Sequence, residues 1–301
     1  MAAQPSLSPA KTGLTFRLGR HRSYLLLIPG LVLSVIFLVL PLAIMVVVSF
    51  YTTAASSTGY LPIFTVENYI AFFTSPQTPI LLVNTFSLAF IAAIICFIFG
   101  FPLAYFLTFH IKNATFKNYV ITLLIVPFLI DWSIRTVAWI AILGHGGIVN
   151  FSLMSLGIIK EPLEELLFSR NTLYIIWLQT YVVFMMFPIY LAMNRIDPDL
   201  INAAKVLKAP PLRVVYDVIF KLSLPGIMAG FIFVFVSTLG DFITPNLWAG
   251  GVQTIGLSIS RYAANFLWPY ASVLSTMLLI IAVIIMYIAF KVVNIKKLFY
   301  E

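Results

Sequence analysis

The chain has 301 residues, of which 61% are hydrophobic and 9% are charged, and its formal net charge is +8. Soluble domains carry roughly a quarter charged residues, so this composition excludes an ordinary soluble fold and predicts an all-α, polytopic membrane protein with about six transmembrane helices. The single cysteine, Cys96, excludes an intrachain disulfide, and no metal site is predicted because no metal-binding spacing of Cys or His occurs.

The first apolar run, Tyr24–Phe50, follows a basic N-terminal leader at residues 1–23. A cleaved signal peptide has a shorter hydrophobic core of roughly 7–15 residues. We therefore predict that this run is a retained signal anchor whose N-terminus lies in the cytoplasm.

Five further apolar runs are long enough to cross a bilayer, which needs about 20 helical residues. They are Ile80–Phe109, Tyr119–Leu143, Thr172–Asn194, Leu222–Thr244 and Ala271–Val292. The six runs predict a transmembrane domain at 24–292, followed by a cytoplasmic tail at 293–301. Gly226 and Gly230 form a GxxxG pair that allows two helices to approach closely, although this spacing is also common by chance.

Two shorter segments lie between the runs. The connection Gly144–Asn171 contains an apolar stretch, Ile148–Ile159, that is too short to span and is expected to be interfacial or re-entrant. Thr65–Phe73 is expected to form a short amphipathic piece.

The basic residues indicate the orientation of the chain. Segments 1–23, 110–118, 195–221 and 291–301 hold 14 of the 18 Lys and Arg residues. Cytoplasmic loops of membrane proteins carry an excess of these residues, so we predict a bacterial inner-membrane protein with both termini in the cytoplasm. The positive charge is thereby explained without nucleic acid as a partner.

The cytoplasmic loop at 195–221 is the longest polar segment on the inner face. Asp197 or Asp199 can cap a helix that has Pro198 at an early position and continues over Leu200–Lys208.

Ala209-Pro210-Pro211 breaks this helix, and a second helix, Leu212–Lys221, runs into the fifth span. The two helices predict a compact projection that either docks into a groove of a partner or forms an interfacial hairpin.

The loop resembles the EAA motif of ABC-transporter permeases. The family pattern of Glu-Ala-Ala, three residues, Gly and a later Leu-Pro falls on Asn202-Ala203-Ala204, Lys208 and Leu224-Pro225. The resemblance implies an ATPase-coupling role for seven residues. They are Asn202, Ala203, Ala204, Leu207, Lys208, Ala209 and Pro210. Asn202 and Lys208 depart from the family's Glu and Gly, so Pro210 and Pro211 are expected to bend the chain.

Further segments resemble the spermidine/putrescine permease branch of this family. They include 134–139, 188–190, 240–242 and 268–269, and the resemblance covers roughly residues 24–292. It implies the fold of a type I ABC importer permease.

No GxxxxGK[ST] signature occurs, so the chain is expected to be a transport subunit and not an enzyme, with no cofactor of its own. The resemblance implies ATP and Mg²⁺ on two separate ATP-binding subunits. It also implies a second, different but homologous permease chain and a periplasmic or extracellular substrate-binding protein.

Charges within spans are costly and usually face a cavity or a partner. Asp131 and Arg135 flank Trp132 at the outer end of the third run, with Trp139 one turn further on. They are four residues apart, so they can pair with each other or line a substrate pathway.

Asp241 stands near the outer end of the fifth run, beside Phe242 and ahead of Trp248. An acid among aromatic rings suits an ammonium group, whereas the alternative is a helix-end acid that contacts water or backbone.

The leading hypothesis is the permease subunit of an ATP-driven importer for a polyamine. The alternatives are an ABC permease for another small solute (an opine, an aminophosphonate, an amino compound or ferric iron) and an ion-driven secondary transporter. No catalytic constellation supports a membrane enzyme.

Overall fold

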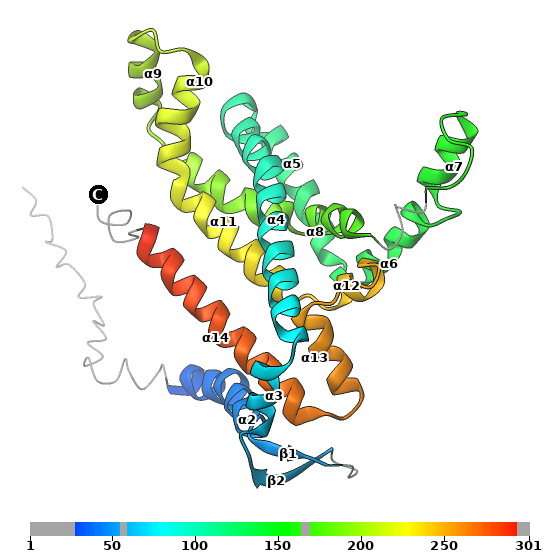
Figure 1. Cartoon of the computed structure of the whole chain (residues 1–301). Helices are drawn as coiled ribbons and strands as arrows, with labels where there is room; N and C mark the ends of the chain where they lie inside the picture. The colour runs from blue at the N-terminus through cyan, green and yellow to red at the C-terminus, as the bar shows by residue number, and fades with distance from the viewer. Residues whose placement is uncertain (1–27, 55–58, 164–168, 294–301) are drawn as a thin grey trace, which may run out of the picture. The chain divides into compact units, whose positions relative to one another are not determined.

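The computed structural model describes residues 28–54, 59–163 and 169–293 (Figure 1). The predicted leader at 1–23 and the predicted tail beyond Val293 lie outside the described residues. The chain divides into two compact units, Met1–Val47 and Val48–Glu301. In the first unit the helix beginning at Ile28 contains a π-helical turn, η1 (Val35–Val39), and continues into α2 (Leu40–Val48).

Six helical stretches among the described residues are long and apolar enough to cross a membrane. They are Ile28–Val48, Gln77–His110, Trp132–Ser155, Arg170–Met193, Pro211–Gly240 and Trp268–Ala289. The prediction of an all-α protein with six spans is confirmed. Five of the six stretches overlap the predicted runs over most of their length, and the third does not.

The third predicted span is wrong as a single helix. The chain forms α5 (Ala114–Ile125) and a 3₁₀ turn, η3 (Val126–Leu129), and then starts again as α6 (Trp132–Leu143). Pro127 stands at the start of the 3₁₀ turn, and the side chain of Asp131 caps α6. Two local signals, a proline and an N-cap, therefore divide the apolar run that hydropathy alone predicted to be one helix.

The stretch expected to be too short to span also differs. It contributes α7 (Ile148–Ser155), which follows α6 so closely that Trp132–Ser155 forms one candidate span of 24 residues. Asn150 lies buried at this junction and donates to the carbonyl of Gly144 (3.1 Å), while its own side-chain oxygen accepts from the N–H of Leu163 (2.9 Å).

A short hairpin after the first helix was not predicted. Strand β1 (Tyr51–Thr53) pairs antiparallel with β2 (Tyr60–Phe64), and α3 (Glu67–Thr74) follows where an amphipathic piece was expected. The amide of Asn68 donates to the carbonyl of Tyr51 (2.8 Å) and holds α3 against β1. A hairpin this short leaves too few residues for alternation to be recognised.

Three helices form the core of the second unit. They are α4 (Gln77–Tyr105), α8 (Arg170–Met193) and α11 (Lys221–Gly240). A Cβ atom on Gly226 would lie 2.4 Å from the carbonyl oxygen of Pro188, and one on Gly230 would lie 2.7 Å from that of Met185. The GxxxG pair therefore has a specific packing role, because only glycine lets α11 approach α8 so closely.

Three helices complete the second unit beyond α11. They are α12 (Ile243–Trp248), α13 (Ile255–Ala264) and α14 (Trp268–Val293). Helix α13 packs along the beginning of α14, and α12 contacts α8 (Figure 1). Asp241, which was expected inside the fifth span, instead lies between the end of α11 and the start of α12.

Candidate functional site

The polar loop forms a projection at the beginning of α11, which we call the knob (residues 197–214). It consists of α9 (Pro198–Val206), a turn and α10 (Pro211–Val214). Asp197 caps α9 by accepting from the N–H of Asp199 (3.0 Å), and Pro198 stands at the first helical position. The predicted N-cap is confirmed.

The turn of the knob corrects the expectation that Pro210 and Pro211 bend the chain. Lys208 adopts the left-handed conformation (φ 55°), its N–H donates to the carbonyl of Lys205 (2.9 Å), and the N–H of Ala209 donates to that of Ala204 (3.1 Å). These two bonds define a Schellman motif whose left-handed position is usually glycine. The lysine thus takes the conformation of the residue it replaces, while Pro211 begins α10.

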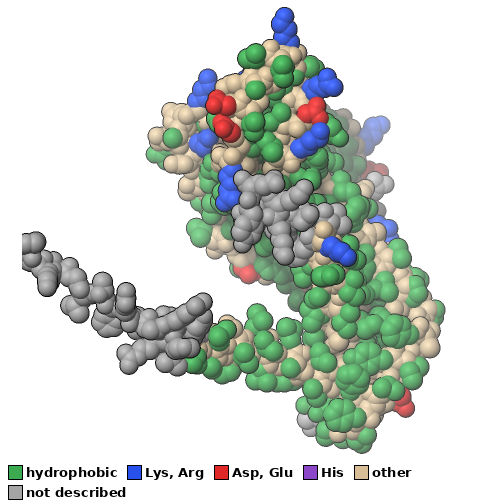
Figure 2. Space-filling model, turned by 90° about the vertical axis from the view of Figure 1, so that its left-hand side faces the viewer, with side chains coloured by type: hydrophobic (Ala, Val, Ile, Leu, Met, Phe, Trp, Pro, Cys, Tyr) green, Lys and Arg blue, Asp and Glu red, His purple; other side chains and the backbone are tan. Residues whose placement is uncertain are grey.

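The tip of the knob exposes large aliphatic side chains. Val206, Leu207 and Leu212 are 82%, 82% and 83% exposed. Figure 1 shows α9 and α10 beyond the end of α4, and Figure 2 shows Lys and Arg side chains gathered over this end of the molecule. The helix from Pro211 to Gly240 has 30 residues, which is about 45 Å against about 30 Å of hydrocarbon. This helix is longer than the hydrocarbon core is thick, so it is long enough to carry the knob beyond that core.

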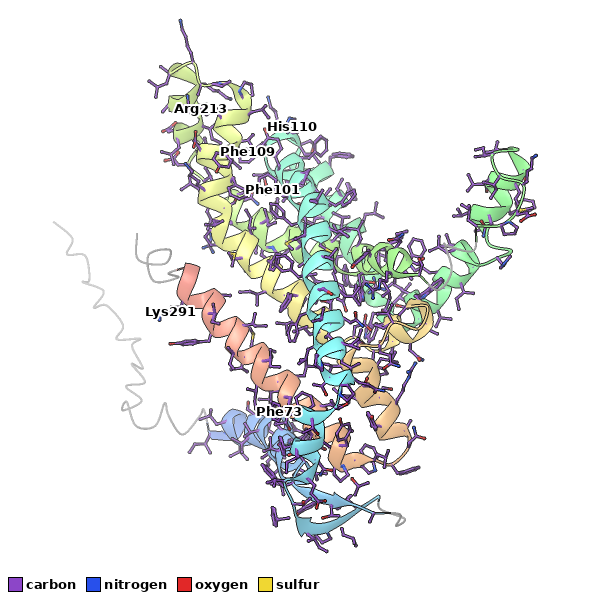
Figure 3. The ribbon with its side chains drawn as sticks, viewed as in Figure 1. Phe73, Phe101, Phe109, His110, Arg213 and Lys291 are labelled. Carbon is purple, nitrogen blue, oxygen red and sulfur yellow. The ribbon has the colours of Figure 1, made fainter. Side chains whose placement is uncertain are left out.

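The base of the knob is fixed to the core by aromatic rings. A π-helical turn, η5 (Val215–Phe220), joins α10 to α11. The ring of Phe220 lies 6.4 Å from that of Phe97 and 6.0 Å from that of Phe101, which Figure 3 labels on α4. These contacts connect the base of the knob to α4 as well as to α11.

A cavity of about 470 Å³ lies at the other end of α11, between η3, α6, α8 and α11. Four residues singled out in the sequence line it. They are Asp131, Trp132, Arg135 and Asp241. The structure thus brings together two sets of residues more than a hundred positions apart, which sequence reasoning treated separately.

Asp241 is buried, with 4% of its surface exposed. Its Oδ2 accepts from the indole N–H of Trp177 (2.7 Å) and the hydroxyl of Thr244 (2.6 Å), and its Oδ1 accepts from the N–H of Thr244 (3.0 Å). Burial raises the pKa of the carboxyl group, and the hydrogen bonds from Thr244 and Trp177 oppose that shift. Three of about four acceptor positions of the carboxylate are occupied by its own chain.

Asp131 and Arg135 do not form an ion pair in the part of the chain that the structure describes. The carboxylate of Asp131 accepts from the N–H of Ser133 (2.9 Å) and from its hydroxyl, and these bonds lower the pKa of the carboxyl group. The guanidinium carbon of Arg135 lies 5.1 Å from the ring centre of Phe128. The N-cap position of Asp131 explains why the spacing of four residues did not produce a pair.

The other predicted pathway residues lie outside this cavity. The indole N–H of Trp139 faces the side chain of Gln179 (3.4 Å), that of buried Trp248 donates to the carbonyl of Thr136 (3.3 Å), and Phe242 is half-exposed. Among the described residues, no group of three or more His, Cys, Asp or Glu side chains could hold a metal ion.

Sequence reasoning missed the aromatic lining of the cavity. Phe128, Tyr181, Phe184 and Phe233 come from three different elements and form part of its wall. In a chain with 27 phenylalanines no local pattern distinguishes these rings from others that face lipid. Only the spacing of Trp177, Tyr181 and Phe184 along one face of α8 offered a weak signal.

Comparison with known protein families gives one match. Residues 97–297 match the family described as "Binding-protein-dependent transport system inner membrane component". The match covers the end of α4, all of α8 and α11, the knob and the cavity.

Two curated relatives show how far the similarity extends. The chain is 31% identical over 268 residues to the spermidine/putrescine transport system permease protein PotB of Haemophilus influenzae, with 87% of this chain and 92% of that protein covered. It is 31% identical over 182 residues to the putative 2-aminoethylphosphonate transport system permease protein PhnU of Salmonella choleraesuis, with 59% of this chain and 62% of that protein covered.

A solved structure shares the fold. A chain of the bacterial alginate ABC transporter, in complex with alginate pentasaccharide-bound periplasmic protein, superposes with a TM-score of 0.69, covering 89% of this chain and 92% of that one. The sequence identity is 18%, so this likeness supports the fold alone.

Proposed function

The chain belongs to the binding-protein-dependent transport system inner membrane components, the permease subunits of ABC importers, and we propose that it conducts a polyamine across a bacterial inner membrane. It is a permease and not an enzyme. The proposed substrate rests on the similarity to the spermidine/putrescine permease over most of both chains.

The chemistry of the cavity agrees with a cationic substrate. Asp131 and Asp241 contribute carboxylates, and the aromatic side chains that line the cavity offer ring faces that attract ammonium groups. Asp241 is held so firmly by Trp177 and Thr244 that its contribution is long-range attraction and not a direct new bond. Asp131, at the exposed edge, is the carboxylate that an entering cation meets.

The knob is the proposed site of coupling to ATP hydrolysis. Its exposed Val206, Leu207 and Leu212 stand clear of the hydrocarbon and need a partner to cover them. We assign that partner to a separate ATP-binding subunit carrying ATP and Mg²⁺, with Asn202, Ala203 and Lys208 in the contact. Movement of the knob would tilt α11 and open the pathway alternately to each side.

The remaining partners follow from the same premise. A second permease chain, different but homologous, would complete the pathway, two ATP-binding subunits would bind the inner face, and a substrate-binding protein would deliver the solute outside. The cationic inner segments support an orientation with both termini in the cytoplasm.

The substrate is tested by uptake of radiolabelled spermidine and putrescine in cells that lack their own polyamine importers and express this chain with its partner subunits. We expect uptake that requires ATP hydrolysis and the binding protein. Absence of polyamine uptake from an assembled transporter would contradict the proposal.

The coupling role is tested by Ala204→Arg. The bulky cation should prevent docking and lower uptake at least about tenfold, while the amount of chain in the membrane stays unchanged. Unchanged uptake in this variant would contradict the coupling role.

A second candidate substrate is 2-aminoethylphosphonate. It has an ammonium group and a phosphonate, and Arg135 in the cavity lining supplies a cation that can attract the phosphonate. The same uptake assay with this compound separates the two candidates.

A further inference from the structure

Three phenylalanine rings form a continuous aromatic wall in the cavity. The ring of Phe128 meets that of Phe184 edge to face (centroids 4.7 Å apart, 81° between planes), and Phe184 stacks on Phe233 (4.6 Å, 22°). The rings come from η3, α8 and α11, so tertiary packing alone assembles them. We call them the aromatic wall.

Arg135 occupies one face of this wall. Its guanidinium carbon lies 5.1 Å from the centre of Phe128, within the range of cation–π attraction. A polyamine ammonium in the same cavity would seek the same kind of ring face, since each cation is attracted by the negative charge above an aromatic ring.

The contacts of Arg135 are poor for a guanidinium. Its Nε and Nη1 are buried and have no hydrogen-bond partner among the described residues, although a guanidinium carries five donors. Buried donors without partners are unfavourable. The ring face of Phe128 is a close contact of the guanidinium, while Asp131 attracts it without forming an ion pair. A position beside Asp131, four residues earlier on the exposed edge of the cavity, would restore both hydration and a charge partner.

We propose that Arg135 is an internal cation that occupies the ammonium subsite of the aromatic wall when the pathway is empty and leaves it when a substrate ammonium arrives. This inference rests on the proposed cationic substrate and adds the subsite and its competitor. A tethered competitor keeps binding weak, and a pathway needs weak binding because each solute must enter and also leave.

The test uses the assembled transporter in detergent without its binding protein, with radiolabelled spermidine as the probe. Arg135→Gln removes the competing cation and should tighten spermidine binding about fivefold. Phe128→Leu keeps an apolar side chain but removes the ring face, and should weaken binding about fivefold. Phe187→Leu, on α8 and not in the cavity wall, is the matched control and should leave binding unchanged.

A second readout needs no ligand. The melting temperatures of R135Q, F128L and the double variant form a double-mutant cycle, and we expect the two single effects to be non-additive because the side chains interact. Additive effects would overturn the inference even if spermidine binds.

Two further outcomes separate the inference from the proposed substrate. Weaker spermidine binding in R135Q, restored by Arg135→Lys, would mean that the positive charge at position 135 supports the structure of the cavity and does not compete with spermidine, and would overturn the inference. If the wild-type transporter takes up 2-aminoethylphosphonate and binds no spermidine, the proposed polyamine substrate is wrong. Displacement of Arg135 by a polyamine is then wrong as well. The interaction between Arg135 and Phe128 would still be supported by the double-mutant cycle.

Discussion

The knob and the cavity lie at opposite ends of the helix that runs from Pro211 to Gly240, and they are built in different ways. The knob is made of consecutive residues, its hydrogen bonds join residues two to five positions apart, and its tip is exposed. The cavity is made of side chains from four elements, and its central acid is buried. The difference indicates that substitutions in the knob should alter coupling with little change in stability, whereas substitutions around the cavity should destabilise the fold.

The largest effect on stability is expected at the crossing of α8 and α11. Gly226→Ala places a Cβ atom 2.4 Å from the carbonyl oxygen of Pro188, so the helices must separate, at a cost of about 3 kcal/mol. Gly30→Ala is the matched control, because Gly30 also lies in a helix and a Cβ atom there meets nothing within 4 Å. Melting temperatures in detergent should fall for the first variant only, and equal values for both would contradict the close packing.

A smaller loss is expected when the buried acid is removed. Asp241→Ala leaves the donors of Trp177 and Thr244 without their acceptor and should lower the free energy of unfolding by about 2 kcal/mol. Asp199→Ala removes an exposed acid from the knob and should cost less than about 0.5 kcal/mol. Chemical denaturation of both variants measures the difference in the free energy of unfolding. Similar losses would contradict the expectation that the cavity contributes more to stability than the knob does.

A gain in stability is expected at the turn of the knob. Lys208→Gly relieves the left-handed backbone of a non-glycine residue and should stabilise the turn by about 0.5–1 kcal/mol. Lys205→Gly, inside α9, should destabilise it by about 1 kcal/mol. Hydrogen exchange at the backbone amides of positions 208 and 209 should become slower in Lys208→Gly and faster in Lys205→Gly. Faster exchange in Lys208→Gly would contradict the Schellman geometry.

Substitutions at the tip of the knob should have the smallest effect on stability and the largest effect on coupling to ATP hydrolysis. Leu207→Asp replaces an exposed side chain and should change the melting temperature negligibly, while uptake falls about tenfold because a carboxylate enters an apolar contact. Uptake and ATP hydrolysis are measured on the assembled transporter. Full uptake in this variant would place the contact with the ATP-binding subunit elsewhere.

Hydropathy and local rules correctly predicted the features that depend only on residues close together in the sequence. The number of spans followed from apolar run length, and the cap at Asp197 followed from one side chain and a proline. The same rules failed at Tyr119–Leu143, where hydropathy continued through a helix end that Pro127 and Asp131 mark. Lys208 was misread because its identity argues against a left-handed turn, whereas the hydrogen bonds of the helix end impose one.

The sequence by itself determined the solvent of this protein, because 61% hydrophobic residues can be accommodated only in lipid. It also determined the projecting loop, because that loop is stabilised by bonds between residues close in the chain. Only the tertiary structure decided that Arg135 lies over Phe128 and not beside Asp131, and that Asp241 is held by Trp177 from another helix. The partner of Asp241 depends on how α8 and α11, which are distant in sequence, place Trp177 and Asp241, and the neighbour of Arg135 depends on the turn between η3 and α6.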